Sequence, residues 1–198
     1  CEVTCITKPT SSTAITIPSS VTISGMEYDV TSLANDAFNN CDYLTSIEIP
    51  NTVTSIGSNA FNDCDALSNI ELPNALTSIG EYAFYSCSIL SDIEIPASVT
   101  TIGNYAFYYC TKLGSVTFAE NSQLATIGNY SFAGNSSNYM QFTSVEIPAS
   151  VTSIGNYAFQ YCTKLEELTF AENSQLATIG QYSFQNCTSL TNIELPST

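Results

Sequence analysis

Six cysteines recur at one position of a repeated pattern, and their chemistry is the first question that this sequence raises. Cysteines in adjacent repeats could form disulfides or bind a soft metal. However, equivalent side chains of stacked repeats point in parallel, whereas a four-ligand metal site needs ligands from several directions. We therefore favour a buried column of small apolar side chains, with disulfide or metal chemistry as the alternative. The column consists of Cys41, Cys64, Cys87, Cys110, Cys162 and Cys187.

Two other cysteines, Cys1 and Cys5, lie outside the repeated pattern. In an oxidising compartment they could bridge each other, or one of them could reach another subunit. A cysteine at position 1 also fits a lipid-anchored mature lipoprotein, although no signal precedes it. The sequence leaves these alternatives open.

Glutamates form a second column, at one outward position of a short strand pattern. Like charges at the spacing of paired strands repel each other, so calcium between repeats or a basic partner would explain them. Calcium needs six to eight oxygen ligands, and this column supplies few. A solvated strand face is the simpler interpretation, and a cation or basic ligand is the alternative. The members are Glu48, Glu71, Glu94, Glu146 and Glu194, with Thr117 and Thr169 between them.

Tyrosines form a third column, immediately before the Ala-Phe or Ser-Phe pair of each repeat. On the outside of a repeat structure such a column could bind a glycan or a partner protein, because tyrosine is enriched at interfaces. The alternative is a partly buried column in which rings of successive repeats stack. The members are Tyr82, Tyr105, Tyr130, Tyr157 and Tyr182.

The residue types exclude most catalytic machinery. The chain contains no histidine, so a histidine-based triad or a histidine metal site is impossible. Its carboxylates recur on an open face rather than in a pocket, which gives no reason for shifted pKa values. Its glycines recur once per repeat and form no phosphate-binding loop. We therefore expect a non-catalytic protein without a cofactor or a metal.

A regular period positions all three columns. A phenylalanine returns after 23 residues three times and then after 25, 27 and 25 residues. Such a period is typical of a solenoid, in which each repeat, here called a rung, buries its apolar face against its neighbours. The phenylalanines are Phe38, Phe61, Phe84, Phe107, Phe132, Phe159 and Phe184.

Each rung contains two short apolar runs. In one rung the first run, residues 44–49, alternates like a half-buried strand and ends at Pro50, since proline cannot donate to a ladder. The second run, residues 53–56, predicts another short strand. Gly57 predicts a bend with positive φ, and residues 58–61 predict a single helical or 3₁₀ turn.

The rungs divide the chain into two parts. Residues 1–37 are expected to form an N-terminal strand and hairpin cap with a degenerate first repeat. Residues 38–198 are expected to form a solenoid of about seven rungs, of which the last is incomplete. Residues 133–141 lack the cysteine and contain extra residues, which predicts a surface loop.

The pattern L-x-x-I-x-I-P-x-x-V-x-x-I-G-x-x-A-F-x-x-C, over about residues 28–198, resembles the BspA-like class of leucine-rich repeats. Departures from it include Ala34 in place of glycine and Asn135 in place of cysteine. The resemblance implies a right-handed, curved solenoid with a parallel β-sheet on its concave face. It also implies short second strands, and short 3₁₀ or helical turns on the convex side. The resemblance further implies a cell-surface or secreted protein that binds other proteins, matrix or other cells.

The net charge of −15 limits the partners of the chain. Nucleic acids and anionic membranes are disfavoured because they need a basic surface, and no apolar run is long enough to span a membrane. We predict an extracellular or cell-surface module for protein–protein interaction and adhesion, with the acidic concave sheet as its binding face. The alternative is a structural protein whose uncapped repeat ends stack head-to-tail into a filament or another self-assembly.

Overall fold

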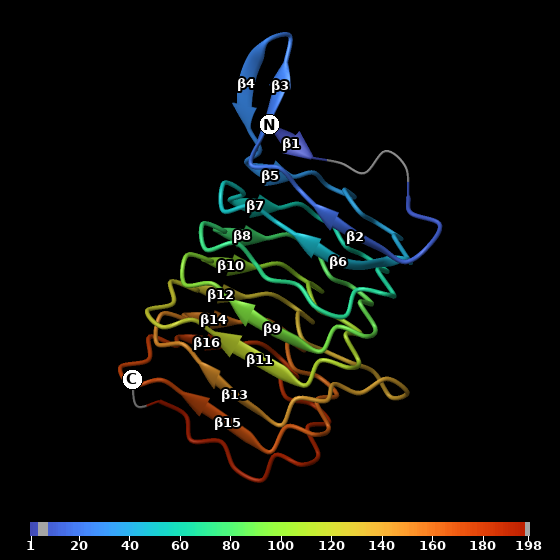
Figure 1. Cartoon of the computed structure of the whole chain (residues 1–198). Helices are drawn as coiled ribbons and strands as arrows, with labels where there is room; N and C mark the ends of the chain where they lie inside the picture. The colour runs from blue at the N-terminus through green and yellow to red at the C-terminus, as the bar shows by residue number, and fades with distance from the viewer. Residues whose placement is uncertain (4–7, 197–198) are drawn as a thin grey trace.

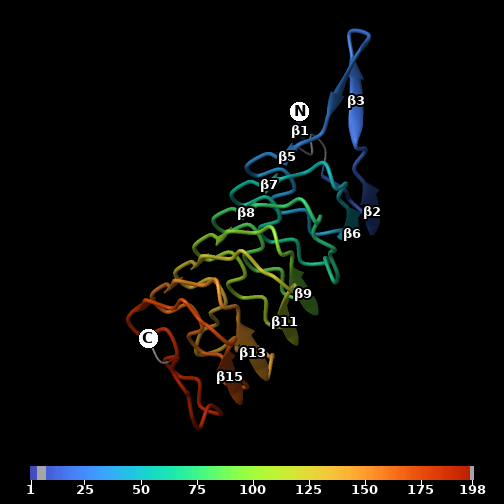
Figure 2. The same ribbon diagram turned by 90° about the vertical axis from the view of Figure 1, so that its left-hand side faces the viewer.

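The computed structural model describes residues 1–3 and 8–196, which form one stack of rungs between an N-terminal hairpin and the C-terminal end (Figure 1). Seen from the side, successive rungs follow one another along a single axis (Figure 2). All regular elements in the described ranges are β-strands, and nearly all pairs between rungs are parallel. The predicted solenoid with a parallel sheet is therefore confirmed.

The continuous sheet of the solenoid is built from the second runs. Each second run contributes two residues, which pair in parallel and in register with the equivalent residues of the next rung. In spatial order the eight strands are β1 (Glu2–Val3), β5 (Ser32–Leu33), β7 (Ser55–Ile56), β8 (Ser78–Ile79), β10 (Thr101–Ile102), β12 (Thr126–Ile127), β14 (Ser153–Ile154) and β16 (Thr178–Ile179).

The first runs pair only locally, which corrects the expectation that they would form the continuous sheet. Residues 67–72 form no strand between β6 and β9, and β11 and β13 are neighbours that do not pair. Which face of the solenoid is concave stays a prediction. The three parallel pairs are β2 (Thr13–Thr16) with β6 (Leu44–Glu48), β9 (Asp92–Ile95) with β11 (Ser115–Phe118), and β13 (Ser144–Ile147) with β15 (Glu167–Phe170).

A column of glycines explains why the second runs approach closely enough to form a ladder. A Cβ atom added to Gly80 would lie 2.6 Å from the carbonyl carbon of Gly57, and Gly103 is packed in the same way against Gly80. The backbones can meet there only because these residues have no side chain. The predicted positive φ at Gly57 is wrong: among the described glycines only Gly25, at the hairpin tip, has a positive φ, of 80°.

The turn that follows each of these glycines is not helical, which corrects the expectation for residues 58–61. Asn59 and Tyr82 occupy the same position of successive rungs and have φ values of 54° and 56°. A left-handed residue interrupts a right-handed helix. Alternate backbone N–H groups of this segment reach the next rung: Phe61 donates to the carbonyl oxygen of Ala83 at 2.7 Å, whereas Ala60 donates back to Gly57 at 3.3 Å. These bonds form a second ladder between rungs.

A stack of phenylalanine rings, one per rung, fills the interior. Neighbouring ring centroids lie 5.1–5.6 Å apart, and the planes differ by at most 12°. The five rings from Phe61 to Phe159 are fully buried. Burial of such a side chain contributes about 1.5–3 kcal/mol, and stacked rings add about 0.5–1.5 kcal/mol. Because the stack runs without a break from Phe38 to Phe184, it ties every complete rung to its neighbours.

The N-terminal segment continues the stack. β1 pairs with β5 and is the first strand of the continuous sheet, while β2 pairs with β6. Between them, β3 (Ser20–Ile23) and β4 (Met26–Asp29) form an antiparallel hairpin that projects away from the rungs (Figures 1 and 2). The division into a cap at residues 1–37 and a solenoid at 38–198 stays a proposal, since β1 already belongs to the sheet.

Three segments depart from the regular rung. Residues 119–123 and 171–175 lengthen the turn between the first and second runs, in place of the usual proline turn. Residues 133–141 form an irregular segment where Asn135 occupies the cysteine position. The Oδ1 atom of Asn135 accepts hydrogen bonds from two N–H groups of the loop itself, at 2.8 and 2.9 Å. Met140, at the end of the loop, is fully buried and fills the core there.

Candidate interaction surfaces

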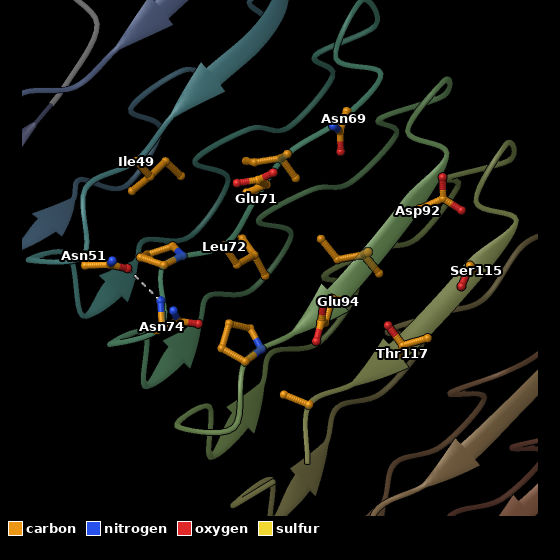
Figure 3. A pocket seen from close by; sticks show the side chains of 15 residues that line it. Ile49, Asn51, Asn69, Glu71, Leu72, Asn74, Asp92, Glu94, Ser115 and Thr117 are labelled. Carbon is orange, nitrogen blue, oxygen red and sulfur yellow. Dashed lines mark hydrogen bonds between the residues drawn. The ribbon is translucent and has the colours of Figure 1, made fainter. Parts of the chain in front are cut away.

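The outward residues of the first runs and of the unpaired segment 67–72 form one surface, here called the first-run face. Four shallow grooves lie on it, with volumes of about 590, 580, 430 and 280 Å³. The largest lies over the unpaired segment, between β6 and β9 and extending to β11 (Figure 3). Its lining includes Ile49, Asn51, Asn69, Glu71, Leu72, Asn74, Asp92, Glu94, Ser115 and Thr117.

All five glutamates of the acidic column line grooves of this face. Glu71 and Glu94 line the largest groove from adjacent rungs (Figure 3), and Glu71 shares the smallest groove with Glu48. Glu146 lines the groove between β11 and β13, and Glu194 lines the groove beside β15. The structure therefore assembles the predicted column into one elongated surface.

Further carboxylates on this face were missed by sequence reasoning. Asp92 lines the same groove as Glu94, and Glu166 and Glu167 line the groove of Glu194. The signal for Asp92 was present in the sequence, because residues two apart in a strand share a face. Asp92 was overlooked because the equivalent residue is Asn69 in one neighbouring rung and Ser115 in the other.

The grooves contain no compensating positive charge. The three basic residues of the chain, Lys8, Lys112 and Lys164, are exposed and line none of the four grooves. Within residues 1–3 and 8–196, no group of three or more acidic or cysteine side chains is placed to hold a metal ion. The first-run face therefore presents a negative potential, which low-dielectric groove walls focus.

The grooves coincide with the places where first runs do not pair. The two that contain Glu71 lie over the unpaired segment 67–72, and a third separates the neighbours β11 and β13. The third is also lined by apolar atoms of Phe118, Pro148 and Ala149. Backbone that is not used in a ladder is thus left facing these grooves, beside both acidic and apolar side chains.

The five column tyrosines form a stack from rung to rung, which was one of the two alternatives that the sequence left open. Neighbouring centroids are 4.6–5.1 Å apart, and the planes differ by 3–20°. All five have positive φ values, from 54° to 59°, which is rare for so bulky a side chain. Four of the rings are half-buried, and Tyr182, at the end of the column, is 55% exposed.

Three more tyrosines widen the column on the same side of the rungs. Tyr85 stacks on Tyr108 with centroids 5.5 Å apart, and Tyr108 lies 4.0 Å from Tyr109. Burial is the largest cause that raises the pKa of Tyr108, followed by its hydrogen bond with Tyr109. Burial likewise raises the pKa of Tyr105 and Tyr130. These phenols therefore stay protonated at neutral pH, with their rings packed together.

The six repeat cysteines lie in the core, each at most 8% exposed. Five of them make the same contact: the thiol donates to the carbonyl oxygen of a phenylalanine in the preceding rung, as from Cys64 to Phe38 at 3.1 Å. Burial raises the pKa of Cys64 to about 12, and burial also raises the pKa of Cys87 and Cys110. In four of these five pairs the same carbonyl oxygen also accepts a backbone N–H group, as that of Phe38 does from Cys41 at 3.1 Å, so the thiol adds a second hydrogen bond to a buried carbonyl.

Of the two cysteines outside the repeat, Cys1 lies among the described residues. Cys1 is exposed, and its amino group donates to the carbonyl oxygen of Asp29 at 2.7 Å. Cys5 lies outside the described residues, so the bridge between Cys1 and Cys5 stays a prediction.

The repeats match a known sequence family. The sequence model described as "BspA type Leucine rich repeat region" matches residues 31–144 and 135–198, in six copies. The chain belongs to the BspA-type leucine-rich repeat family. The resemblance found in the sequence is therefore confirmed, and the family is one of repeat scaffolds rather than of enzymes. No curated protein sequence matched the chain.

Solved structures of leucine-rich repeat proteins share the fold. A leucine rich cell surface protein of Faecalibacterium prausnitzii A2-165 is 35% identical, with a TM-score of 0.72 over 90% of this chain and 46% of that one. A leucine-rich repeat protein of Bacteroides ovatus is 31% identical, with a TM-score of 0.68 over 92% and 51%. The leucine rich repeat protein of T. pallidum is 29% identical, with a TM-score of 0.72 over 90% and 78%. This chain spans about half the length of the first two.

In the part of the chain that the structure describes, no helix has the length and apolar character needed to cross a bilayer.

Proposed function

We propose that this chain is the ligand-binding solenoid of a cell-surface or secreted protein and acts without catalysis. Its partner is a protein that presents a basic, extended segment to the first-run face. The observation that supports this proposal is the acidic, lysine-free lining of the grooves along that face. The description of the F. prausnitzii relative as a cell surface protein supports the location.

An extended segment along the solenoid axis would pass one rung after another. Equivalent positions of neighbouring rungs lie about 4.8 Å apart, whereas side chains on one face of an extended segment recur about every 6.7 Å, so long, flexible lysine side chains are needed to reach the acidic positions. Each exposed ion pair contributes only about 0–1 kcal/mol. Useful affinity therefore needs several pairs together, with apolar contacts to side chains such as Ile49 and Leu72 at the edges of the grooves. Electrostatic steering also accelerates association.

The proposal is tested with a synthetic peptide that alternates lysine with glycine. The groove variant carries Glu71→Gln, Asp92→Asn and Glu94→Gln. The matched control variant carries Glu2→Gln, Asp42→Asn and Glu172→Gln, which are exposed and line no groove. Both variants lose three negative charges, so they differ only in where these charges lay.

Calorimetric titration of the peptide at low and physiological salt is the measurement. Three lost pairs of about 0.5 kcal/mol each weaken binding about tenfold in the groove variant, whereas the control changes it less than about twofold. Equal weakening in both variants would show that the peptide senses net charge alone, and would refute the first-run face as the site.

Self-assembly is a second candidate, and exposed apolar side chains in the last rungs favour it. Ile179, Tyr182 and Leu195 are 39%, 55% and 61% exposed. A second copy that docked its N-terminal strand β1 beside β16 would cover them and extend the parallel sheet. Light scattering over a range of concentrations tests this idea, because the mass rises with concentration only if copies join. A mass that stays at that of one chain would exclude the filament.

A further inference from the structure

We propose that the tyrosine column (Tyr82, Tyr105, Tyr130, Tyr157 and Tyr182) is a site of oxidative modification, at which a peroxide-driven one-electron oxidant joins adjacent rungs through dityrosine. This inference goes beyond ligand binding and does not depend on it. The column is the longest run of π-stacked phenols in the molecule and lies away from the first-run face.

The geometry of the column favours coupling between neighbours. Tyr130 lies 4.7 Å from Tyr105 and 4.6 Å from Tyr157, measured between centroids, and these planes differ by only 7° and 9°. Neighbouring phenol rings therefore lie face to face along the column. The positions recur at every rung, because the backbone ladder on this side fixes their spacing: Tyr130 N–H donates to the carbonyl oxygen of Asn156 at 3.0 Å.

The composition directs a one-electron oxidant to these rings. The chain contains no tryptophan and no histidine, and twelve tyrosines. The repeat cysteines are buried, and burial raises the pKa of Cys64, Cys87 and Cys110, so these three present little reactive thiolate. The more reactive thiols lie at the two ends of the stack: Cys1 is exposed, and the hydrogen bond with Cys162 lowers the pKa of Cys187. Of the two methionines, Met140 is fully buried and Met26 lies on the N-terminal hairpin. The phenols of the column are thus oxidisable groups that solvent can reach along the solenoid, and the more exposed Tyr43 and Tyr139 compete with them for the oxidant.

Each of two neighbouring phenols loses one electron and one proton and becomes a phenoxyl radical. The radicals form one carbon–carbon bond between ring positions adjacent to the oxygens, and proton migration restores both phenols. The two electrons and two protons reduce one hydrogen peroxide, whose oxygen–oxygen bond breaks, to two waters. The product has lost two hydrogen atoms and keeps both hydroxyl groups.

A dityrosine within the column would act as a staple between rungs. The linked residues are 23 apart for Tyr82 and Tyr105, and 27 apart for Tyr130 and Tyr157. A cross-link of this kind restricts the unfolded chain, as a disulfide that closes a loop of similar length does. The oxidised monomer is therefore expected to unfold at a higher urea concentration than the untreated monomer.

The test uses the full chain, a peroxidase and hydrogen peroxide at low protein concentration, followed by isolation of the monomer by gel filtration. Digestion at glutamate separates all column tyrosines, because Glu94, Glu120, Glu146 and Glu172 lie between successive members. Mass spectrometry then identifies linked peptides that have lost two hydrogens. We expect links between Tyr130 and Tyr157 and between Tyr157 and Tyr182 within the monomer.

Two conservative variants make the result decisive. Tyr157→Phe keeps the stacked ring and removes one phenol, so both of those links disappear while links that involve Tyr82 and Tyr105 remain. Tyr139→Phe removes a 41% exposed tyrosine that has no stacked ring partner in the described structure, and leaves the yield of dityrosine in the monomer unchanged. The proposal is overturned if the monomer contains no dityrosine, or if the links join isolated tyrosines such as Tyr43 and Tyr139.

Discussion

The two sides of each rung differ in strand pairing, although the distance between repeats is the same on both: one side forms a continuous sheet and the other forms only isolated pairs. On the side of the second runs, eight two-residue strands pair without interruption from β1 to β16. On the first-run face the strands are twice as long, yet they pair only in twos and leave grooves between the pairs. Strand length therefore does not decide where the continuous sheet forms.

Local chemistry explains the difference. Second runs end at glycines whose missing side chains let neighbouring backbones meet. Four of the first runs end at a proline, Pro50, Pro73, Pro96 or Pro148, which has no N–H group to donate. Proline ends these runs but does not prevent pairing, because three of the four pair with a neighbouring strand. The side of the second runs, here called the closed side, thus has a continuous sheet that stabilises the stack. The first-run face, here called the open side, has no continuous sheet and contains the charged grooves.

The largest effect is expected from a methyl group placed on the closed side. Gly103→Ala puts a Cβ 2.6 Å from the carbonyl carbon of Gly80, so two rungs must separate, and the free energy of unfolding should fall by about 3 kcal/mol. Gly114→Ala is the matched control on the first-run face, where the nearest atom is 3.6 Å away, and should change stability by less than about 0.5 kcal/mol. Urea unfolding measures both. Equal losses of stability in the two variants would show that the backbones of neighbouring rungs do not pack more closely on one side than on the other.

The buried thiols between the two sides predict a dependence on pH. An unfolded thiol releases its proton near pH 9.0, whereas folded Cys64 keeps its proton until about pH 12. The stability from this group is therefore complete below pH 9.0 and is lost between these values, by about 1.4 kcal/mol per pH unit. Urea unfolding from pH 8 to 10.5 should show a shallower decline for Cys64→Ala than for the parent. Identical slopes would contradict a protonated thiol in the folded state.

The positive φ values of the column tyrosines predict a dependence of stability on the residue type at these positions. Both Tyr105→Ala and Tyr105→Asn remove the stacked ring, but only asparagine tolerates a φ of 57° readily. We expect the asparagine variant to be more stable than the alanine variant by about 1 kcal/mol, although both are less stable than the parent. Thermal unfolding of the two variants measures this difference, and the reverse order would show that backbone strain is unimportant there.

The smallest effect belongs to the open side. Glu94→Gln removes one of two like charges that line the same groove with Glu71. The free energy of unfolding should rise by about 0.3 kcal/mol at low salt, and the gain should vanish in 1 M salt because screening removes the repulsion. A loss of stability at low salt would mean that Glu94 makes a stabilising contact instead.

Much of this architecture was predictable because the columns repeat in register. The phenylalanine stack, the stacked tyrosines and the shared face of Glu71 and Glu94 all follow from a period near 23 residues. The choice of side for the continuous sheet did not follow, because the six residues from Leu44 resemble a strand more strongly than the two at Ser55–Ile56. Pairing depends on how closely backbones approach, and the role of Gly57 in that approach was mistaken for a turn with positive φ.

The predicted helical turn was wrong for a related reason. A tyrosine followed by an alanine is compatible with a helix, so the sequence of the rungs from Tyr82 onward does not indicate the left-handed residue. The earlier rungs carried the signal: Asp36 and Asn59 occupy that position, and both residue types tolerate positive φ. Comparing one position down the column, rather than reading along a single rung, would have found it.

The irregular segments have a consequence for how the chain finds its fold. Rungs that resemble one another so closely can exchange partners, and a slip by one whole rung would preserve most contacts of the phenylalanine stack. The longer turns at 119–123 and 171–175 make equivalent contacts, because Gln123 N–H reaches the carbonyl oxygen of Ala97 and Gln175 N–H reaches that of Ala149, both at 2.8 Å. The insertion at 133–141 occurs once, and its Gly134 N–H reaches the carbonyl oxygen of Gln160 at 2.8 Å. This insertion therefore distinguishes the native alignment of rungs from a slipped one.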